Sequence, residues 1–317
     1  MQITVTVLDD SGQALVEGGE ELAGRPGLKW IDVTGPDEPT LRRLQERFGL
    51  HRLAVEDCLH LDQRPKFEEY PNHQFLVMQA FAAAGSNICD LTLHEMHTFI
   101  GEDFVISVHE QALPAIDEAR RRFWQDPAQT FARGRDFVVY ALVDALVDMN
   151  FPLLDAIDDA IEALEEKIFE DVDPEQFARA FEIKRTIVTL RRVLSPQRDV
   201  IALLTRPGMA FVGERSALYF RDVYDHLIRL NEQIDSARDL IANARDAWLS
   251  AMANRTNDIT KQLTIFATIF LPLTFITGFF GQNFVELQKP GYFWLMLVLC
   301  FVLPLGLIVW FRYRKWV

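Results

Sequence analysis

Two long apolar runs lie at the C-terminal end of the chain. Residues 263–280 and 292–311 contain no Asp, Glu, Lys, Arg or His. At about 1.5 Å of rise per residue, each run is long enough to cross the apolar core of a bilayer as a helix. Only residues 281–291 separate the two runs, so the sequence predicts a transmembrane hairpin with a short loop between two spans.

The charged residues beside these spans predict the orientation of the hairpin. Three basic residues follow the second span in the tail, residues 312–317, whereas one Glu and one Lys in the loop cancel. Positively charged flanks stay on the cytoplasmic side. We therefore expect a multi-pass protein of the cell (inner) membrane whose N- and C-termini are both cytoplasmic.

The hydrophobic pattern changes along the cytoplasmic part. Short alternating or β-rich runs, bounded by turn residues, dominate the first third of the chain, and residues 40–48 have a helical pattern. This texture predicts a small α+β domain. The predicted strands are Gln2–Leu8, Leu28–Val33, Gln74–Ala80, Met96–Ile100 and Asp103–Val108.

Helical periodicity dominates from residue 113 onwards. Residues 136–168 and 174–204 predict helices, and a Pro-Gly breaker at 207–208 precedes a third helical run. Because no Pro or Gly interrupts residues 214–271, the simplest interpretation is one helix that continues into the first span. Some 65 residues make a helix of roughly 100 Å, which is long enough to serve as a stalk.

These patterns divide the chain into successive regions. We expect a cytosolic α+β domain over residues 1–112, a cytosolic helical and stalk region over 113–262, a pore-lining first span over 263–280, an external loop over 281–291, a second span over 292–311 and a basic cytosolic tail over 312–317.

Composition excludes several classes of function. The chain carries 32 Lys and Arg against 46 Asp and Glu, a formal net charge of −14, so no nucleic-acid partner is expected. Its three Cys form no CxxC pair, which argues against a disulfide framework or a zinc finger. The chain has no phosphate-binding loop, dinucleotide fingerprint or Ser-His-Asp set, and we expect no enzyme activity.

His94 and His97 are a weaker candidate for a metal site. Metalloprotease chemistry needs His at i and i+4 on a helix, whereas these two lie at i and i+3 in a β-leaning segment. On a strand the two imidazoles would point to opposite faces. We therefore do not expect zinc to bind there.

The first span carries a stripe of small and hydroxyl residues on one helical face. Such a face suits either a pore wall or close packing of helices in the membrane. Pro272 also frees the carbonyl of Thr268, which is tolerated at membrane depth where it faces protein or water. Steps of three and four residues place Asn257, Thr260, Thr264, Ala267, Leu271, Thr274 and Gly278 on this face, with Leu263 at its edge.

Residues 254–284 (NRTNDITKQLTIFATIFLPLTFITGFFGQNF) resemble the pore helix of the CorA-type, two-span GxN divalent cation transporters. Residues 56–70, 140–148 and 219–227 also resemble cytosolic stretches of this family, in the family's order, so the likeness covers nearly the whole chain. The resemblance implies a funnel-shaped homopentamer in the bilayer, with an α+β cytosolic domain, long stalk helices that line a central pore, and second spans in an outer ring.

The resemblance also implies the ion and the selectivity loop. Gly281, Gln282 and Asn283 stand at the family's Gly-Met-Asn signature, where rings of neutral amides would bind the water shell of Mg²⁺. Gly281 would serve the sharp exit from the helix, as a glycine directly after a helix end does. Because Gln282 replaces Met, the chain is also similar to the branch that includes ZntB-type zinc transporters, and Co²⁺ or Zn²⁺ are alternative substrates.

Regulation by cytosolic Mg²⁺ is a further implication of the family. Asp222 corresponds to a carboxylate that senses the ion between neighbouring subunits, with Asp225 close to it in sequence. In the partner stretch, residues 81–90, only Asp90 is acidic, so a weak sensor is expected. The alternative to a channel is a non-conducting or stress-sensing membrane protein that retains the fold.

Overall fold

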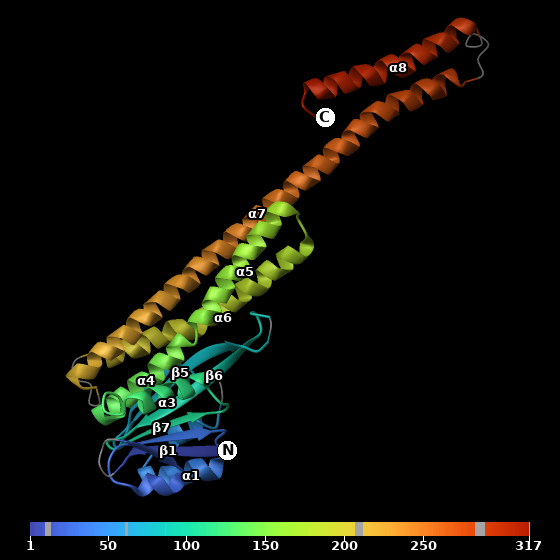
Figure 1. The fold of residues 1–317 in the computed structure, drawn as a ribbon. Coiled ribbons are helices and arrows are strands. Elements are labelled where there is room, and N and C mark those ends of the chain that lie inside the picture. Colours follow the sequence, from blue (N-terminus) through green and yellow to red (C-terminus); the bar gives the residue numbers. More distant parts are fainter. Residues whose placement is uncertain (10–13, 61–62, 86, 207–211, 283–288, 317) are drawn as a thin grey trace. The chain divides into compact units, whose positions relative to one another are not determined.

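The computed structural model describes all residues except 10–13, 61–62, 86, 207–211, 283–288 and 317 (Figure 1). These residues form two compact units. The first comprises Met1–Lys167 and Asp173–Arg245, and the second comprises Ile168–Val172 and Asp246–Val317.

The first unit contains a seven-stranded mixed sheet with the strand order β2-β1-β3-β7-β6-β5-β4. Only β3 and β7 run parallel, and every other neighbouring pair is antiparallel. The strands are β1 (Gln2–Leu8), β2 (Leu15–Gly18), β3 (Lys29–Thr34), β4 (Lys66–Glu69), β5 (Gln74–Ala83), β6 (Leu91–Ile100) and β7 (Phe104–His109).

Helices cover both faces of this sheet because its central strands are apolar on both sides. Helices α1 (Glu38–Phe48) and α2 (Arg52–Asp57) pack against one face, where Ile31 of β3 is fully buried. On the other face, Trp30 meets Phe123 of α3 (Pro114–Gln125) edge-on, with ring centroids 5.3 Å apart. The predicted α+β class is therefore confirmed.

Long helices follow the sheet. They are α4 (Arg135–Asp148), α5 (Phe151–Glu170), α6 (Pro174–Leu204) and α7 (Glu214–Phe280). Helices α6 and α7 lie where periodicity predicted them, with α7 uninterrupted through Pro272.

The helical pattern over residues 136–168 corresponds to two helices, because α4 ends before Asn150. The side chain of Asn150 donates to the carbonyls of Leu146 (3.3 Å) and Val147 (3.0 Å) and accepts from the backbone N–H of Phe81 (3.1 Å). An amide that bonds to its own helix end and to a strand competes with continued helix. This region is apolar enough to cross a membrane by composition, yet 72% of its most apolar window is buried inside the unit.

The short elements β2, β4 and α2 and the helix α3 escaped the sequence patterns. Strands β2 and β4 are the two edges of the sheet and have four residues each, too few for a clear alternation of apolar and polar positions. Strand β6 also begins five residues before the predicted start, since its first half carries the polar side chains of His94 and Glu95.

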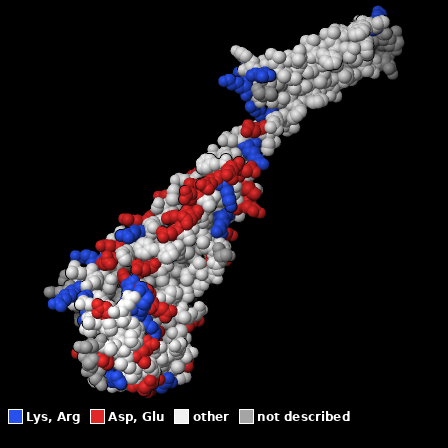
Figure 2. All heavy atoms as spheres, in the orientation of Figure 1, with Lys and Arg blue, Asp and Glu red and all other residues white. Residues whose placement is uncertain are grey.

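The second unit contains the C-terminal part of α7 and helix α8 (Pro290–Tyr313). Both helices are long and apolar enough to cross a membrane, and neither apolar window is buried in the protein. The surface of this pair is free of charged side chains except towards its ends (Figure 2). At one end, Lys261 Nζ donates to the carbonyl of Lys315 over 3.4 Å, which ties the tail to α7.

Candidate ion pathway and cation cluster

The predicted pore stripe is exposed along α7. The side of α7 that is covered within the unit carries half-buried, mostly bulky side chains such as Ile269 and Leu273. The stripe therefore has no packing partner among the described residues of this chain. Its exposed members are Asn257, Thr260, Leu263 (67% exposed), Thr264, Ala267, Leu271 (76% exposed), Thr274 and Gly278.

The hydroxyl groups of this stripe are arranged to accept hydrogen bonds. Thr260 donates its hydroxyl hydrogen to the carbonyl of Thr256 (2.8 Å), and Thr274 donates to the carbonyl of Phe270 (2.9 Å). Because the only hydrogen of each hydroxyl is engaged, its oxygen presents lone pairs. Water bound to a cation points its hydrogens outward, so such oxygens suit a hydrated cation.

Helix α7 ends at Phe280, directly before Gly281, and the chain leaves the helix there without a left-handed residue among those that the structure describes. Gly281 is not among the described glycines with a positive φ, and its N–H donates to Thr277 (2.9 Å), which continues the helical pattern. A Cβ at Gly281 would lie 3.0 Å from the Thr277 carbonyl oxygen, so glycine is favoured here by a close approach. Gln282 is exposed next to it, whereas Asn283 lies outside the described residues.

A cluster of cation ligands lies between α4 and α7 in the first unit. Asp144 and Asp148, one turn apart on α4, face His226 of α7, whose Nδ1 lies 3.9 Å from Asp144 Oδ1 and 3.1 Å from Asp148 Oδ1. Within the described ranges, this is the one group of three or more His, Cys, Asp or Glu whose ligand atoms lie within 4.8 Å. Asp144 Oδ1 and His226 Nδ1 have no hydrogen-bond partner.

Arg122 of α3 already supplies positive charge to this cluster. Its guanidinium donates to Asp144 Oδ2 at 2.5 Å and approaches Asp148 Oδ2 at 3.8 Å. Burial, and then the charge of Asp144, raise the pKa of Asp148. Carboxylate oxygens are ligands that Mg²⁺ prefers, and imidazole is a ligand that Zn²⁺ and Co²⁺ prefer, so this set of side chains fits a divalent cation. A bound cation would have to compete with the guanidinium of Arg122 for the carboxylates.

The predicted regulatory residues stand in two places. Asp222 lies one turn before His226 on α7, and its charge adds to the burial that raises the pKa of Tyr140 to about 12. Asp225 is exposed on the same helix. Asp90 lies instead before β6, beside a cavity of about 360 Å³ that Arg185 of α6 also lines.

Sequence reasoning missed Asp144 and Asp148, although a signal was present. The segment 140–148 reads YALVDALVD, with two carboxylates at i and i+4 inside an otherwise apolar run. Asp144 is 4% exposed, and a charged residue that is this deeply buried is almost always paired. The pairing partners come from α3 and α7, which are distant in sequence.

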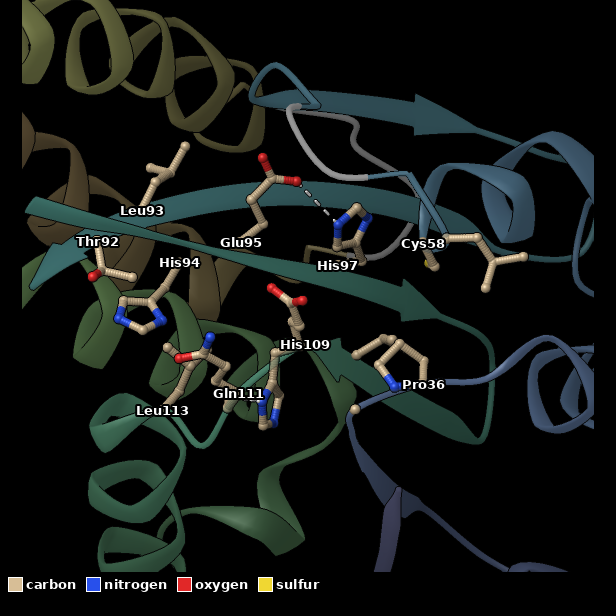
Figure 3. A pocket seen from close by; sticks show the side chains of 14 residues that line it. Pro36, Cys58, Thr92, Leu93, His94, Glu95, His97, His109, Gln111 and Leu113 are labelled. Carbon is tan, nitrogen blue, oxygen red and sulfur yellow. Dashed lines mark hydrogen bonds and ion pairs between the residues drawn. The ribbon is translucent and has the colours of Figure 1, made fainter.

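A separate cavity of about 440 Å³ lies where the parallel strands β3 and β7 end (Figure 3). His94 points away from Glu95 and His97, as expected for alternate faces of β6. Glu95 is bound by Gln79 Nε2 (2.9 Å). His109 lies between Asp32 Oδ1 (3.0 Å) and a backbone carbonyl, and although burial opposes it, the bond to Asp32 raises the pKa of His109.

This combination of features defines a class of protein. An α+β domain continues through one long helix into two apolar helices, and the first of these keeps a hydroxyl-bearing face exposed, which is the architecture expected of a membrane protein that transports ions. The sequence model of the CorA-like Mg²⁺ transporter protein matches residues 26–314, and the chain belongs to this family. The family consists of transporters of divalent cations, not of enzymes.

Individual proteins show how far the likeness extends. The cobalt/magnesium transport protein CorA of Thermotoga maritima is 35% identical over 291 residues, 90% of this chain and 83% of that protein. The zinc transport protein ZntB of Yersinia enterocolitica is 30% identical over 181 residues, 55% of this chain and 54% of that protein. The complete structure of the CorA magnesium transporter from Methanocaldococcus jannaschii shares the fold, with a TM-score of 0.86, 23% identity and coverage of 100% of this chain and 99% of that one.

Proposed function

We propose that this chain forms a homopentameric channel that conducts hydrated divalent cations, with Mg²⁺ as the main substrate. The exposed stripe of α7 carries the proposal. One hairpin cannot enclose a water-filled path in lipid, so several copies must surround an axis if Thr274 and Asn257 face water. Neutral oxygens along that axis would bind the water shell of the ion without stripping it.

The choice of ion rests on the selectivity loop and on the relatives. Gly281, Gln282 and Asn283 offer neutral amides and backbone carbonyls in place of a cage of carboxylates, which suits an ion that keeps its waters. Relatives named for magnesium, cobalt and zinc transport make Co²⁺ and Zn²⁺ the alternative substrates. The basic tail supports an inner-membrane topology with both termini in the cytoplasm.

Leu263 and Leu271 would form hydrophobic constrictions in this pore. Both are large, apolar and more than half exposed on the stripe. Rings of apolar side chains gate ion flow by excluding water. The acidic surplus of the chain lies in residues 1–261 and would raise the local concentration of cations on its side of the membrane.

The cation cluster supports a regulatory role for Mg²⁺. Asp222 lies one turn from His226 on the same helix, and in this proposal it would bind the ion together with Asp225 and a neighbouring subunit's Asp90, in a site shared between subunits. Since Arg122 already compensates Asp144, we infer that the site responds weakly to Mg²⁺.

Uptake into liposomes that contain a magnesium-sensitive dye tests the proposed channel. Thr274→Val keeps the shape of the side chain but removes the acceptor oxygen, and we expect slower uptake by an intact pentamer. Thr268→Val is the matched control, because Thr268 is half-buried within the unit whereas Thr274 is exposed. Asn283→Ala should abolish uptake.

Several results would contradict the channel. Wild-type rates in both Thr274→Val and Asn283→Ala would remove these residues from the pathway. An intact pentamer of the unaltered chain that moves no divalent cation would favour the non-conducting alternative. A monomer in the membrane would exclude the pore altogether.

A further inference from the structure

The tail at the end of α8 forms a hydrogen-bonded turn that positions its basic side chains. The N–H of Trp316 donates to the carbonyl of Phe311 (2.9 Å), and the N–H of Lys315 donates to that of Arg312 (3.1 Å). This is the hydrogen-bond pattern of a Schellman motif, in which the left-handed position is usually a glycine. Here Lys315 holds that position, with φ 55°, and no other non-glycine residue that the structure describes has a positive φ.

Apolar contacts hold this turn in place. Phe311 is 1% exposed and is the buried residue of α8, and its ring stacks on that of Trp316 with centroids 5.7 Å apart. The guanidinium of Arg314 lies over the ring of Trp310 at 5.8 Å. Lys261 of α7 donates to the carbonyl of Lys315, so the turn is also fastened to the first apolar helix.

The result is a cluster of four cations at one end of the hairpin, formed by Lys261, Arg312, Arg314 and Lys315. None of the four forms an ion pair with a carboxylate in the part of the chain that the structure describes. Figure 2 shows basic side chains gathered at this end of the apolar pair. Trp310, Tyr313 and Trp316 are exposed among them.

We propose that this tail cluster binds the phosphate groups of anionic phospholipids. The adjoining runs, residues 263–280 and 292–311, carry no charged residue, so the cluster lies at the level of lipid headgroups, where phosphates are the abundant anions. Exposed Trp and Tyr side chains favour the same level, since one part of each ring system is apolar and the other polar. A bound lipid would also contact the base of α7 through Lys261.

Quenching of tryptophan fluorescence by brominated lipid measures this binding in the full-length protein. Trp294→Phe serves as the background, because Trp310 and Trp316 are then the tryptophans left in the uncharged runs and the tail. In nanodiscs of phosphatidylcholine, brominated phosphatidylglycerol should quench more strongly than brominated phosphatidylcholine at the same mole fraction.

Variants separate charge from structure. The double variant Arg312→Gln, Arg314→Gln should raise the mole fraction of phosphatidylglycerol needed for half-maximal quenching about thirty-fold. Each lost cation weakens lipid binding about five-fold, and the two factors multiply. Lys315→Gly should raise it about five-fold while keeping the turn, because glycine prefers the left-handed backbone that Lys315 adopts. Lys289→Gln, at the opposite end of α8, is the matched control and should leave it unchanged.

Three results would overturn the assignment. Equal quenching by the two brominated lipids would show that the cluster does not select anionic headgroups. Unchanged quenching in both Lys315→Gly and the double Arg variant would show that these charges are not used. Reversal by millimolar inorganic phosphate would indicate a site for free phosphate. Because no step measures ion uptake, the outcome is independent of the proposed channel.

Discussion

Replacing Arg122 by Met should turn the cation cluster from a weak site into a strong one. In the native protein, the guanidinium lies 2.5 Å from Asp144, whose side chain is 6% exposed. The substitution keeps the apolar stem of the side chain and removes its charge. Asp144 and Asp148 then face His226 with no internal cation to compensate them.

The stability lost in Arg122→Met depends on how deeply the ion pair between Arg122 and Asp144 is buried. Removing one partner of a fully buried ion pair costs about 3–5 kcal/mol, but Arg122 is 31% exposed, so about 2 kcal/mol of stability should be lost without divalent cation. A divalent cation present at about 100 times its dissociation constant would raise the free energy of unfolding by about 2.7 kcal/mol. Mg²⁺ should therefore stabilise Arg122→Met by more than it stabilises the native protein.

Thermal unfolding of the full-length protein in detergent, with and without Mg²⁺, measures this difference. In EDTA the variant should unfold roughly 4–8 °C below the native protein, and Mg²⁺ should recover most of that loss. Arg121→Met is the matched control, since Arg121 is exposed and pairs with Glu118 alone in the described chain. A variant that is destabilised in EDTA and gains nothing from Mg²⁺, Co²⁺ or Zn²⁺ would refute the cluster as a cation site.

Three further predictions concern selectivity, regulation and pH. Gln282→Met should shift competition between Mg²⁺ and the softer ions Zn²⁺ and Co²⁺ without abolishing uptake, and identical competition profiles would remove this position from ion choice. Mg²⁺ should protect the first unit from trypsin only modestly, and Asp222→Ala should remove most of that protection; strong protection that survives the change would place the ion elsewhere. Burial of His73, with neither ring nitrogen hydrogen-bonded, lowers its pKa to about 4, so the folded state prefers the neutral ring. The contribution of His73 to stability should be fully present above pH 6.5 and should fall by up to about 3 kcal/mol between pH 6.5 and 4, and His73→Phe should flatten this loss in denaturant titrations at several pH values.

The long helix and the apolar pair were determined by the sequence alone. Both depend on local information, namely helical periodicity over many turns, absence of breakers before Pro272 and two runs without a charged residue. The exposed stripe follows from the same periodicity, because residues three and four apart share a helix face. Strands β1 and β3 were likewise predicted almost to the residue, from short alternating or β-rich runs bounded by turn residues.

Tertiary structure decided the features that join distant segments. Arg122, Asp144 and His226 come from α3, α4 and α7, and no local pattern brings a guanidinium, a carboxylate and an imidazole together. The break after α4 depends likewise on Phe81 of β5, to which Asn150 binds. The backbone geometry at Gly281 was also visible only in the folded chain. The same holds for the burial of Phe311, because an apolar run without charge predicts that a helix crosses a membrane but not which of its side chains find a partner.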